Sequence, residues 1–106
     1  MSNQQLLELA AKAADYDVMR TMSGRIVVGF KVWDPLNDDG DAFRLQVDLD
    51  IVVSRGVGIV MAKYDSFNPE TFEEFKIIYQ SVLDDYRASS RLAIVCAAAE
   101  IGAAMP

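Results

Sequence analysis

The residues whose types and spacing could do chemistry are most concentrated in one acidic segment, residues 34–41, which has the sequence DPLNDDGD. A run of carboxylates around a glycine suggests a calcium loop. When Gly40 is aligned with the glycine of an EF-hand loop, the first ligand position falls on Pro35 and the last falls on Gln46. Neither residue supplies the carboxylate needed there. The sequence therefore predicts no metal site, and it favours a capped helix start on a solvated acidic loop.

The usual residues of nucleophilic and acid–base catalysis are missing or poorly placed. The chain has no histidine, which excludes Ser-His-Asp and Cys-His arrangements. Cys96 lies among apolar residues with no adjacent cation, and this favours a buried, unreactive thiol. Four carboxylates fall on a predicted helix or directly at its end, where such a run is typical of a solvated face: Glu73, Glu74, Asp84 and Asp85. We therefore predict no catalytic residues, no cofactor and no enzyme activity.

Aromatic residues at predicted strand ends could serve either the core or a partner. Trp33 precedes the acidic segment, and an indole there could seal the core or anchor a protein contact. Tyr64 and Phe67 pose the same question at the end of another strand. The residues that we select as a candidate partner-binding site are Trp33, Asp34, Asp38, Asp39 and Asp41.

Length and charge limit the remaining function classes. The chain has 106 residues, of which 52% are hydrophobic, and this suits one domain spanning residues 1–106. Its 16 acidic and 10 basic residues give a net charge of −6, which disfavours direct binding to nucleic acid. There is no signal-peptide pattern and no apolar run of the roughly 18 residues that a membrane helix needs. We expect a cytoplasmic protein that does not bind membranes.

Hydrophobic periodicity predicts about four helices. The first covers residues 4–16 and is capped by Ser2 or Asn3. Residues 39–49 follow the acidic loop and favour a helix, although residues 45–51 also alternate as a strand would. The two remaining helices cover residues 70–83, after Asn68-Pro69-Glu70, and the segment from Ser89 or Ser90 to about Ala104.

The remaining segments are rich in β-branched and aromatic residues and predict strands. They cover residues 18–22, 25–33, 51–54 and 57–64, with a hairpin turn at the Gly56-x-Gly58 motif. We expect an α/β (α+β) domain, in which a small antiparallel or mixed sheet of three to five strands packs with about four helices. A βαβ crossover through residues 39–49 would make the sheet mixed.

Two segments also resemble a known group of proteins. Residues 33–45, WDPLNDDGDAFRL, resemble a W-[ND]-P-L-x-D-D-G-D-A-x-R-L signature, and residues 91–102, RLAIVCAAAEIG, resemble an R-x-A-I-V-x-A-A-A-x-I-G ending. Both are similar to small hypothetical proteins of tailed phages and prophages, a group that resembles phage domains with an α-β-α sandwich. The resemblance implies this fold and a phage origin, but it brings no activity and no functional residues.

These observations support three hypotheses for function. The first is a non-enzymatic phage accessory protein that binds a host protein, for example to inhibit a bacterial defence system. The second is a small-ligand protein, such as one that sequesters a nucleotide signal, and convergence of three cationic side chains in one cleft would favour it. The third is a structural or assembly role in the virion, with formation of homo-oligomers.

Overall fold

The computed structural model describes residues 2–20, 23–82 and 85–106. Within this part of the chain there are three helices and two three-stranded sheets, so the predicted α+β class is confirmed. The helices are α1 (Asn3–Ala13), α2 (Asp39–Asp48) and α3 (Tyr86–Ala103). The small sheet contains β1 (Val18–Arg20), β2 (Ile26–Val28) and β3 (Lys31–Val32). The larger sheet contains β4 (Val52–Gly56), β5 (Ile59–Asn68) and β6 (Glu73–Ser81).

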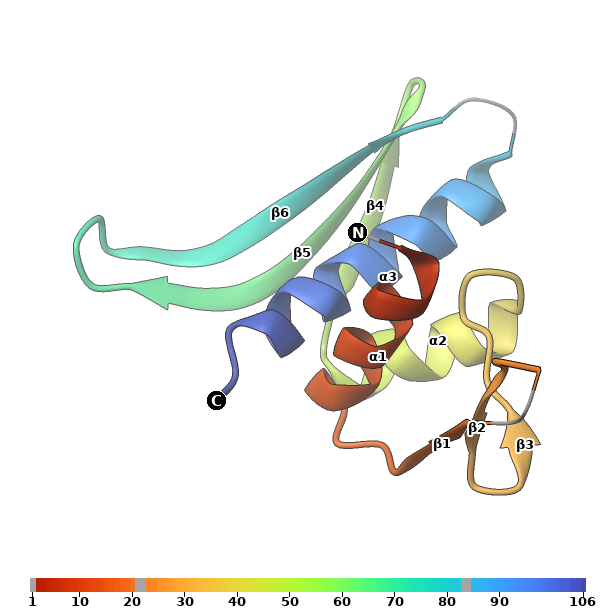
Figure 1. The fold of residues 1–106 in the computed structure, drawn as a ribbon. Helices are drawn as coiled ribbons and strands as arrows, with labels where there is room; N and C mark the ends of the chain where they lie inside the picture. The colour runs from red at the N-terminus through yellow and green to blue at the C-terminus, as the bar shows by residue number, and fades with distance from the viewer. Residues whose placement is uncertain (1, 21–22, 83–84) are drawn as a thin grey trace.

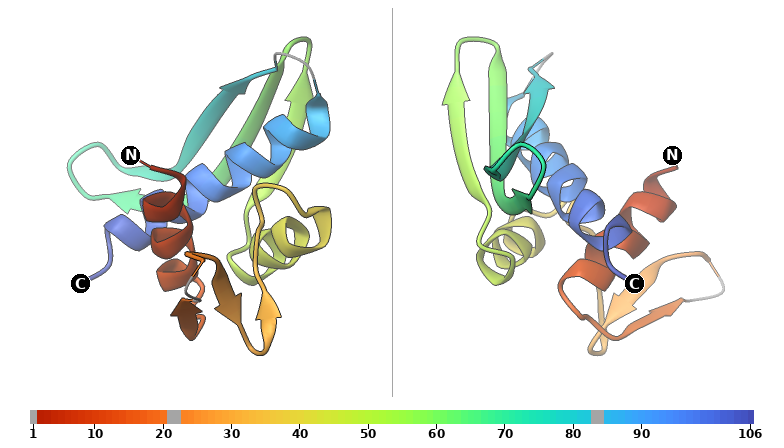
Figure 2. Two further views of the ribbon diagram at one scale, coloured as in Figure 1. Left: turned by 45° about the vertical axis from the view of Figure 1, so that its right-hand side comes forward. Right: turned by 90° about the vertical axis from the view of Figure 1, so that its left-hand side faces the viewer.

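Helix α3 is the central element of the fold (Figure 1). The sheet β4-β5-β6 lies on one side of α3, and α1 with the small sheet lies on the other, as the right-hand view of Figure 2 shows. One core cluster joins residues from all three helices and both sheets. No described helix has the length and apolar character needed to cross a bilayer.

Small residues allow α3 to approach its neighbours closely. The alanines at 93, 97 and 98 on α3 are fully buried, as are Ala10 and Ala11 on α1. On β5, the residues that face α3 are also buried: Val60, Ala62 and Tyr64. The small residues of α3 therefore let it pack closely against both α1 and β5.

Two of the predicted helix starts are correct in detail. Ser2 caps α1 through a capping box with Gln5, in which each side chain accepts a hydrogen bond from the other residue's backbone N–H. Asp38 caps α2 by accepting from the N–H of Asp41. The sequence allowed either a helix or a strand from residue 45 onward. The structure shows that the helix continues through residue 48, and the strand β4 begins only at Val52.

The predicted helix over residues 70–83 is wrong, because this segment forms β6. Phe72, Phe75 and Tyr79 fit a helical spacing, but residues 75–79 also suit a strand that packs against a neighbour. β6 pairs antiparallel with β5 over almost its whole length, with Tyr79 opposite Met61 and Phe75 opposite Asp65. The long-range pairing therefore overrides the local helical spacing. As a consequence, Glu73 and Glu74 lie on a strand, Asp85 caps α3 and Asp84 lies outside the described residues.

Two other boundaries and the type of sheet differ from the predictions. The strand expected over residues 25–33 is two strands, because Gly29 and Phe30 both have positive φ and turn the chain between β2 and β3. The last helix begins three residues before Ser89, because Asp85 accepts from the N–H of Arg87 and caps it. All pairings are antiparallel, so the mixed sheet is not formed in the described part of the chain.

The remaining strand predictions agree more closely. The hairpin around Gly56-x-Gly58 forms between β4 and β5, and Gly58 has the positive φ expected of it. β5 extends four residues beyond the predicted end at Tyr64. The strand predicted over residues 18–22 is present as β1, while its last two residues, Thr21 and Met22, lie outside the described residues.

Candidate functional site

The aromatic residue of the predicted partner-binding site lies in the core. Trp33 is only 6% exposed, and its ring meets that of Tyr16 edge-on at a centroid separation of 5.7 Å. The sequence left open whether this indole seals the core or anchors a contact, and the structure places it in the core. Tyr64 is buried as well, whereas Phe67 is exposed.

The carboxylates of the acidic loop are largely engaged within the protein. Asp41 is only 4% exposed; its carboxylate accepts from the Asp34 N–H at 2.9 Å and binds Arg44 at 2.6 Å. Asp39 forms an ion pair with Arg91 at 2.6 Å. No group of three or more potential metal ligands is found among the described residues. The loop thus closes the start of α2, and its role in partner binding stays a prediction.

Replacing Asp41 with alanine should lower the free energy of unfolding by about 2 kcal/mol. The substitution removes the acceptor for the partly buried Asp34 N–H and the ion pair with Arg44, and an unsatisfied buried donor costs about 1–3 kcal/mol. Urea denaturation followed by circular dichroism measures the change. Alanine at Asp65, an exposed carboxylate on β5, is the control and should change stability by less than about 0.5 kcal/mol. Equal effects of the two substitutions would contradict the role of Asp41.

The Cys96 thiol and the Tyr64 hydroxyl are both held in their neutral forms at neutral pH. Burial and the nearby Glu100 carboxylate raise the pKa of the half-buried Cys96 thiol above its usual range. Burial, together with a hydrogen bond donated to Glu100 at 2.7 Å, raises the pKa of Tyr64. Because the thiolate is the reactive form, Cys96 is a poor nucleophile at neutral pH.

The sheet β4-β5-β6 has one face that no described element covers. Val60, Ala62 and Tyr64 point toward α3, so the alternating residues of β5 and their partners on β6 point outward. This outer face carries exposed apolar side chains from all three strands: Val52, Phe67, Phe75 and Tyr79. Tyr79 is 62% exposed and Phe75 is 44% exposed. Lys63 lies 4.2 Å above the Phe75 ring centroid, in a cation–π contact.

No described strand pairs with the outer edge of β6, which is one of the two edge strands in the order β4-β5-β6. The Val82 N–H donates to the Gly58 carbonyl at 3.0 Å, so Gly58 and Val82 form a hydrogen-bonded pair. Hydrogen-bonded and non-bonded pairs alternate in an antiparallel ladder. The N–H and C=O groups of Phe75, Ile77 and Tyr79 therefore point toward this outer edge.

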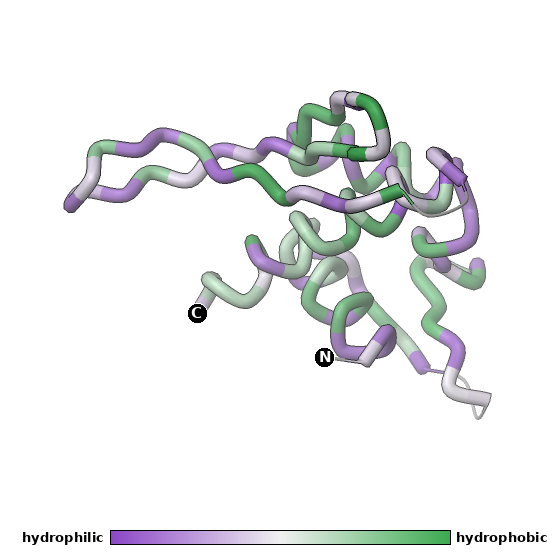
Figure 3. The backbone as a smooth tube through the Cα atoms, turned by 90° about the horizontal axis from the view of Figure 1, so that it is seen from above, coloured by the Kyte–Doolittle hydropathy of each residue, from purple (hydrophilic) through white to green (hydrophobic). Residues whose placement is uncertain are grey.

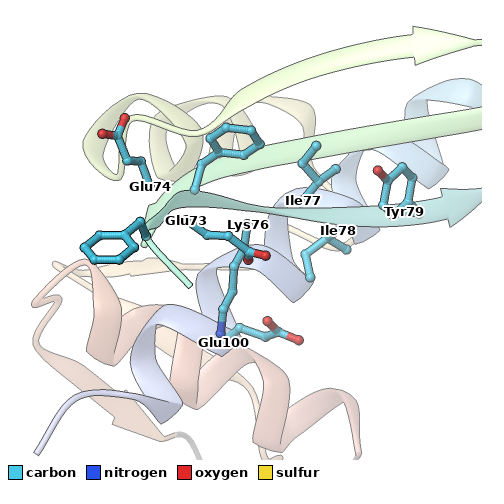
Figure 4. Close-up of a pocket in the computed structure, with 9 residues that line it drawn as sticks. Glu73, Glu74, Lys76, Ile77, Ile78, Tyr79 and Glu100 are labelled. Carbon is cyan, nitrogen blue, oxygen red and sulfur yellow. The ribbon is translucent and has the colours of Figure 1, made fainter. Parts of the chain in front are cut away.

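A hollow of about 690 Å³ runs along β6 from Phe72 to Tyr79 and reaches Glu100 on α3. Figure 4 shows Lys76 and Ile78 on the side of β6 that faces α3, while Ile77 lies on the opposite side. The outer part of the β5–β6 hairpin extends beyond the helices (Figure 3). This hairpin therefore presents a strand edge, an aromatic face and an adjoining hollow to the surroundings.

The sequence reasoning missed this surface because it assigned β6 to a helix. One signal could have found it: residues 75–79, FKIIY, combine aromatic and β-branched residues, which are enriched in strands.

Comparison with known proteins finds no matching family model, no matching curated protein and no matching solved structure. The resemblance of residues 33–45 and 91–102 to tailed-phage proteins stays a prediction.

Proposed function

We propose that this chain is a non-enzymatic binding protein that docks on a protein partner through β6. The observation that carries the proposal is the outer edge of this nine-residue strand, with the exposed rings of Phe75 and Tyr79 beside it. An exposed strand edge offers unpaired backbone groups to an incoming strand, which is a recurrent mode of peptide and protein recognition.

The arrangement supplies both affinity and selectivity. A strand of the partner would pair with the backbone groups of Phe75, Ile77 and Tyr79, and these hydrogen bonds do not depend on sequence. The outer face would then bury the aromatic rings, which are common anchors in protein interfaces. The outer part of the hairpin extends beyond the helices (Figure 3), so a partner can reach that part of β6 without meeting the helices.

Charge narrows the class of partner. Four carboxylates surround the outer end of the hairpin, namely Asp65, Glu70, Glu73 and Glu74, against the two cations Lys63 and Lys76. A partner with a basic rim would therefore be steered toward this surface, and its association rate would fall as salt is added.

The resemblance to tailed-phage proteins supplies the setting of the proposal. In that setting the partner is a host protein in the bacterial cytoplasm, and inhibition of a defence complex that handles nucleic acid is one concrete form. Such complexes carry basic grooves, which an acidic protein could occupy without binding nucleic acid itself.

Affinity capture from a bacterial host lysate tests this proposal. The tagged protein should retain a stoichiometric host protein at low salt, and recovery should fall at high salt. The variant Tyr79→Lys should reduce recovery by about tenfold, because it removes an aromatic anchor and places a cation at the edge that meets a basic partner.

The matched control is Phe30→Lys, which makes the same type of change at an exposed aromatic residue of the β2–β3 turn. This variant should retain the partner as the unchanged protein does. The proposal is contradicted if no host protein is retained at low salt, or if both variants lose the partner equally.

A further inference from the structure

Three arginines line a cleft at the β4 edge of the large sheet, which is the edge opposite β6. The cleft lies where α2, β4 and α3 meet, and it has a volume of about 190 Å³. Arg55 reaches it from β4, and Arg87 and Arg91 reach it from α3. The chain has only 10 basic residues against 16 acidic ones, so three in one cleft are a marked local excess of positive charge.

Each arginine is placed by a specific element. Arg87, Ser90 and Arg91 are three and four residues apart on α3, which puts them on one helical face. Tyr86 ties the start of α3 to the β4–β5 turn, because its hydroxyl donates to the Gly56 carbonyl at 3.0 Å and accepts from the Gly58 N–H at 2.9 Å. This contact ties Arg55, the residue before Gly56, to the same end of α3 as Arg87, and both line the cleft.

Only one of the three guanidinium groups is neutralised by an acidic partner among the described residues. Arg91 binds the Asp39 carboxylate at 2.6 Å and the Leu36 carbonyl at 2.9 Å. Arg55 and Arg87 form no ion pair with a described residue. Three cations and the one carboxylate of Asp39 leave the cleft with a local charge of +2. Like charges that line one small cleft favour binding of an anion there.

We propose that this cleft binds the phosphate group of a small phosphorylated molecule. Guanidinium groups present paired N–H donors that match phosphate oxygens, which makes arginine the preferred residue for this recognition. Ser90 also lines the cleft, and its hydroxyl is a group that can donate a further hydrogen bond. This site is separate from the protein-docking surface, and the two proposals stand or fall independently.

The dimensions of the cleft favour a charged group rather than a whole ligand. Its volume of about 190 Å³ is below the roughly 300–1,000 Å³ of pockets that enclose drug-sized molecules. The rest of the ligand would therefore lie at the rim, where the Phe43 side chain is 62% exposed. An aromatic ring in this position suits stacking with a planar group such as a nucleobase.

Nuclear magnetic resonance titration of the whole chain tests the proposal with three probes: inorganic phosphate, adenosine monophosphate and adenosine. We expect phosphate and the nucleotide to shift the amide signals of residues 87–91 and 55 to saturation. Adenosine lacks the phosphate and should produce no saturable shift there. If both phosphate-bearing probes leave these signals unchanged at about 10 mM, at which a ligand with a Kd of about 1 mM would occupy roughly nine-tenths of the sites, the proposal is overturned.

The double variant R55Q/R87Q should weaken nucleotide binding by about tenfold or more, because it removes the two unpaired guanidinium groups. Arg91 is left intact, since it also supports the loop at Leu36. The control K31Q/K63Q removes the same charge at sites outside the cleft and should change the affinity less than about twofold. An equal loss in both double variants would show attraction by overall charge alone and would overturn the assignment to the cleft.

The variant Phe43→Ser tests whether the cleft recognises the phosphate group of a nucleotide or free inorganic phosphate. If the ligand is a nucleotide, this variant should weaken binding of adenosine monophosphate and leave binding of inorganic phosphate unchanged. If both probes bind the unchanged protein equally and Phe43→Ser affects neither, the cleft still binds phosphate, but the aromatic group at the rim takes no part.

Discussion

Replacing Trp33 with alanine should lower the free energy of unfolding by about 3–5 kcal/mol, which is the usual range for removing a large aromatic side chain from a core. Trp33 is almost fully buried, and its ring packs edge-on against that of Tyr16. Its backbone N–H donates to the Ile26 carbonyl at 2.8 Å. The backbone bond survives the substitution, so the loss measures side-chain packing. A domain of this size has a stability of only about 5–15 kcal/mol, and the variant should be close to unfolding.

Urea denaturation followed by circular dichroism measures the effect, because the variant loses the only tryptophan of the chain and with it the fluorescence signal. Trp33→Phe is the control; it keeps an aromatic ring and should lose clearly less stability than the alanine variant. The phenylalanine variant also tests whether Trp33 acts by packing in the core or by contacting a partner protein. It should retain a captured partner as the unchanged protein does, and a folded variant that loses the partner would restore Trp33 as an anchor.

The sequence predicts those features that a few neighbouring residues determine. Ser2 and Asp38 cap helices because a side-chain oxygen reaches a backbone N–H three residues further along the chain. Gly58 predicts the β4–β5 turn because it adopts positive φ at low cost. The small residues of α3 predict close packing, although they do not say which element approaches.

The identity of β6 depends on a partner strand, and this explains why local spacing fails there. Asn68-Pro69-Glu70 is typical of a helix start, yet Asn68 accepts from the Glu70 N–H in a turn, and its carbonyl accepts from the Phe72 N–H. The chain therefore reverses, and β6 returns along β5. Residues 73–81 carry both signals, because residues 75–79 are of strand-favouring types while Phe75 and Tyr79 keep a helical spacing, and the pairing with β5 decides in favour of the strand.

The acidic loop and the arginine cleft also differ in how far the sequence alone could predict them. The acidic loop is contiguous in sequence, so its carboxylates can be recognised as a cluster without the structure. In the fold, however, they cap α2 and form ion pairs with Arg44 and Arg91. The arginine cleft is assembled from β4 and from α3, two elements that are separated by the whole β5–β6 hairpin. Sequence reasoning could state that three converging cations would indicate a ligand site, but only the fold shows which three converge.

Replacing Gly102 with alanine should also cost a large part of the stability, about 3 kcal/mol. A Cβ atom at this position would lie 2.0 Å from the carbonyl oxygen of Leu9 and 2.8 Å from its carbonyl carbon. Both atoms belong to the backbone of α1, so the clash is relieved only if α1 moves away from α3. Overpacking of this kind costs about 1–3 kcal/mol or more, and α1 would lose its contacts with the buried alanines of α3 as it moved.

The better helix propensity of alanine opposes this loss by only about 1 kcal/mol, so the clash decides the sign. Gly40→Ala is the matched control, because Gly40 is also helical but its added Cβ would meet the side-chain ends of Arg44 and Asp38 at 3.3 Å. The Arg44 end can shift, and this variant should be neutral or slightly more stable. Thermal and urea denaturation of both variants provide the comparison. If Gly102→Ala were as stable as Gly40→Ala, α1 and α3 would have to lie further apart than the structure places them.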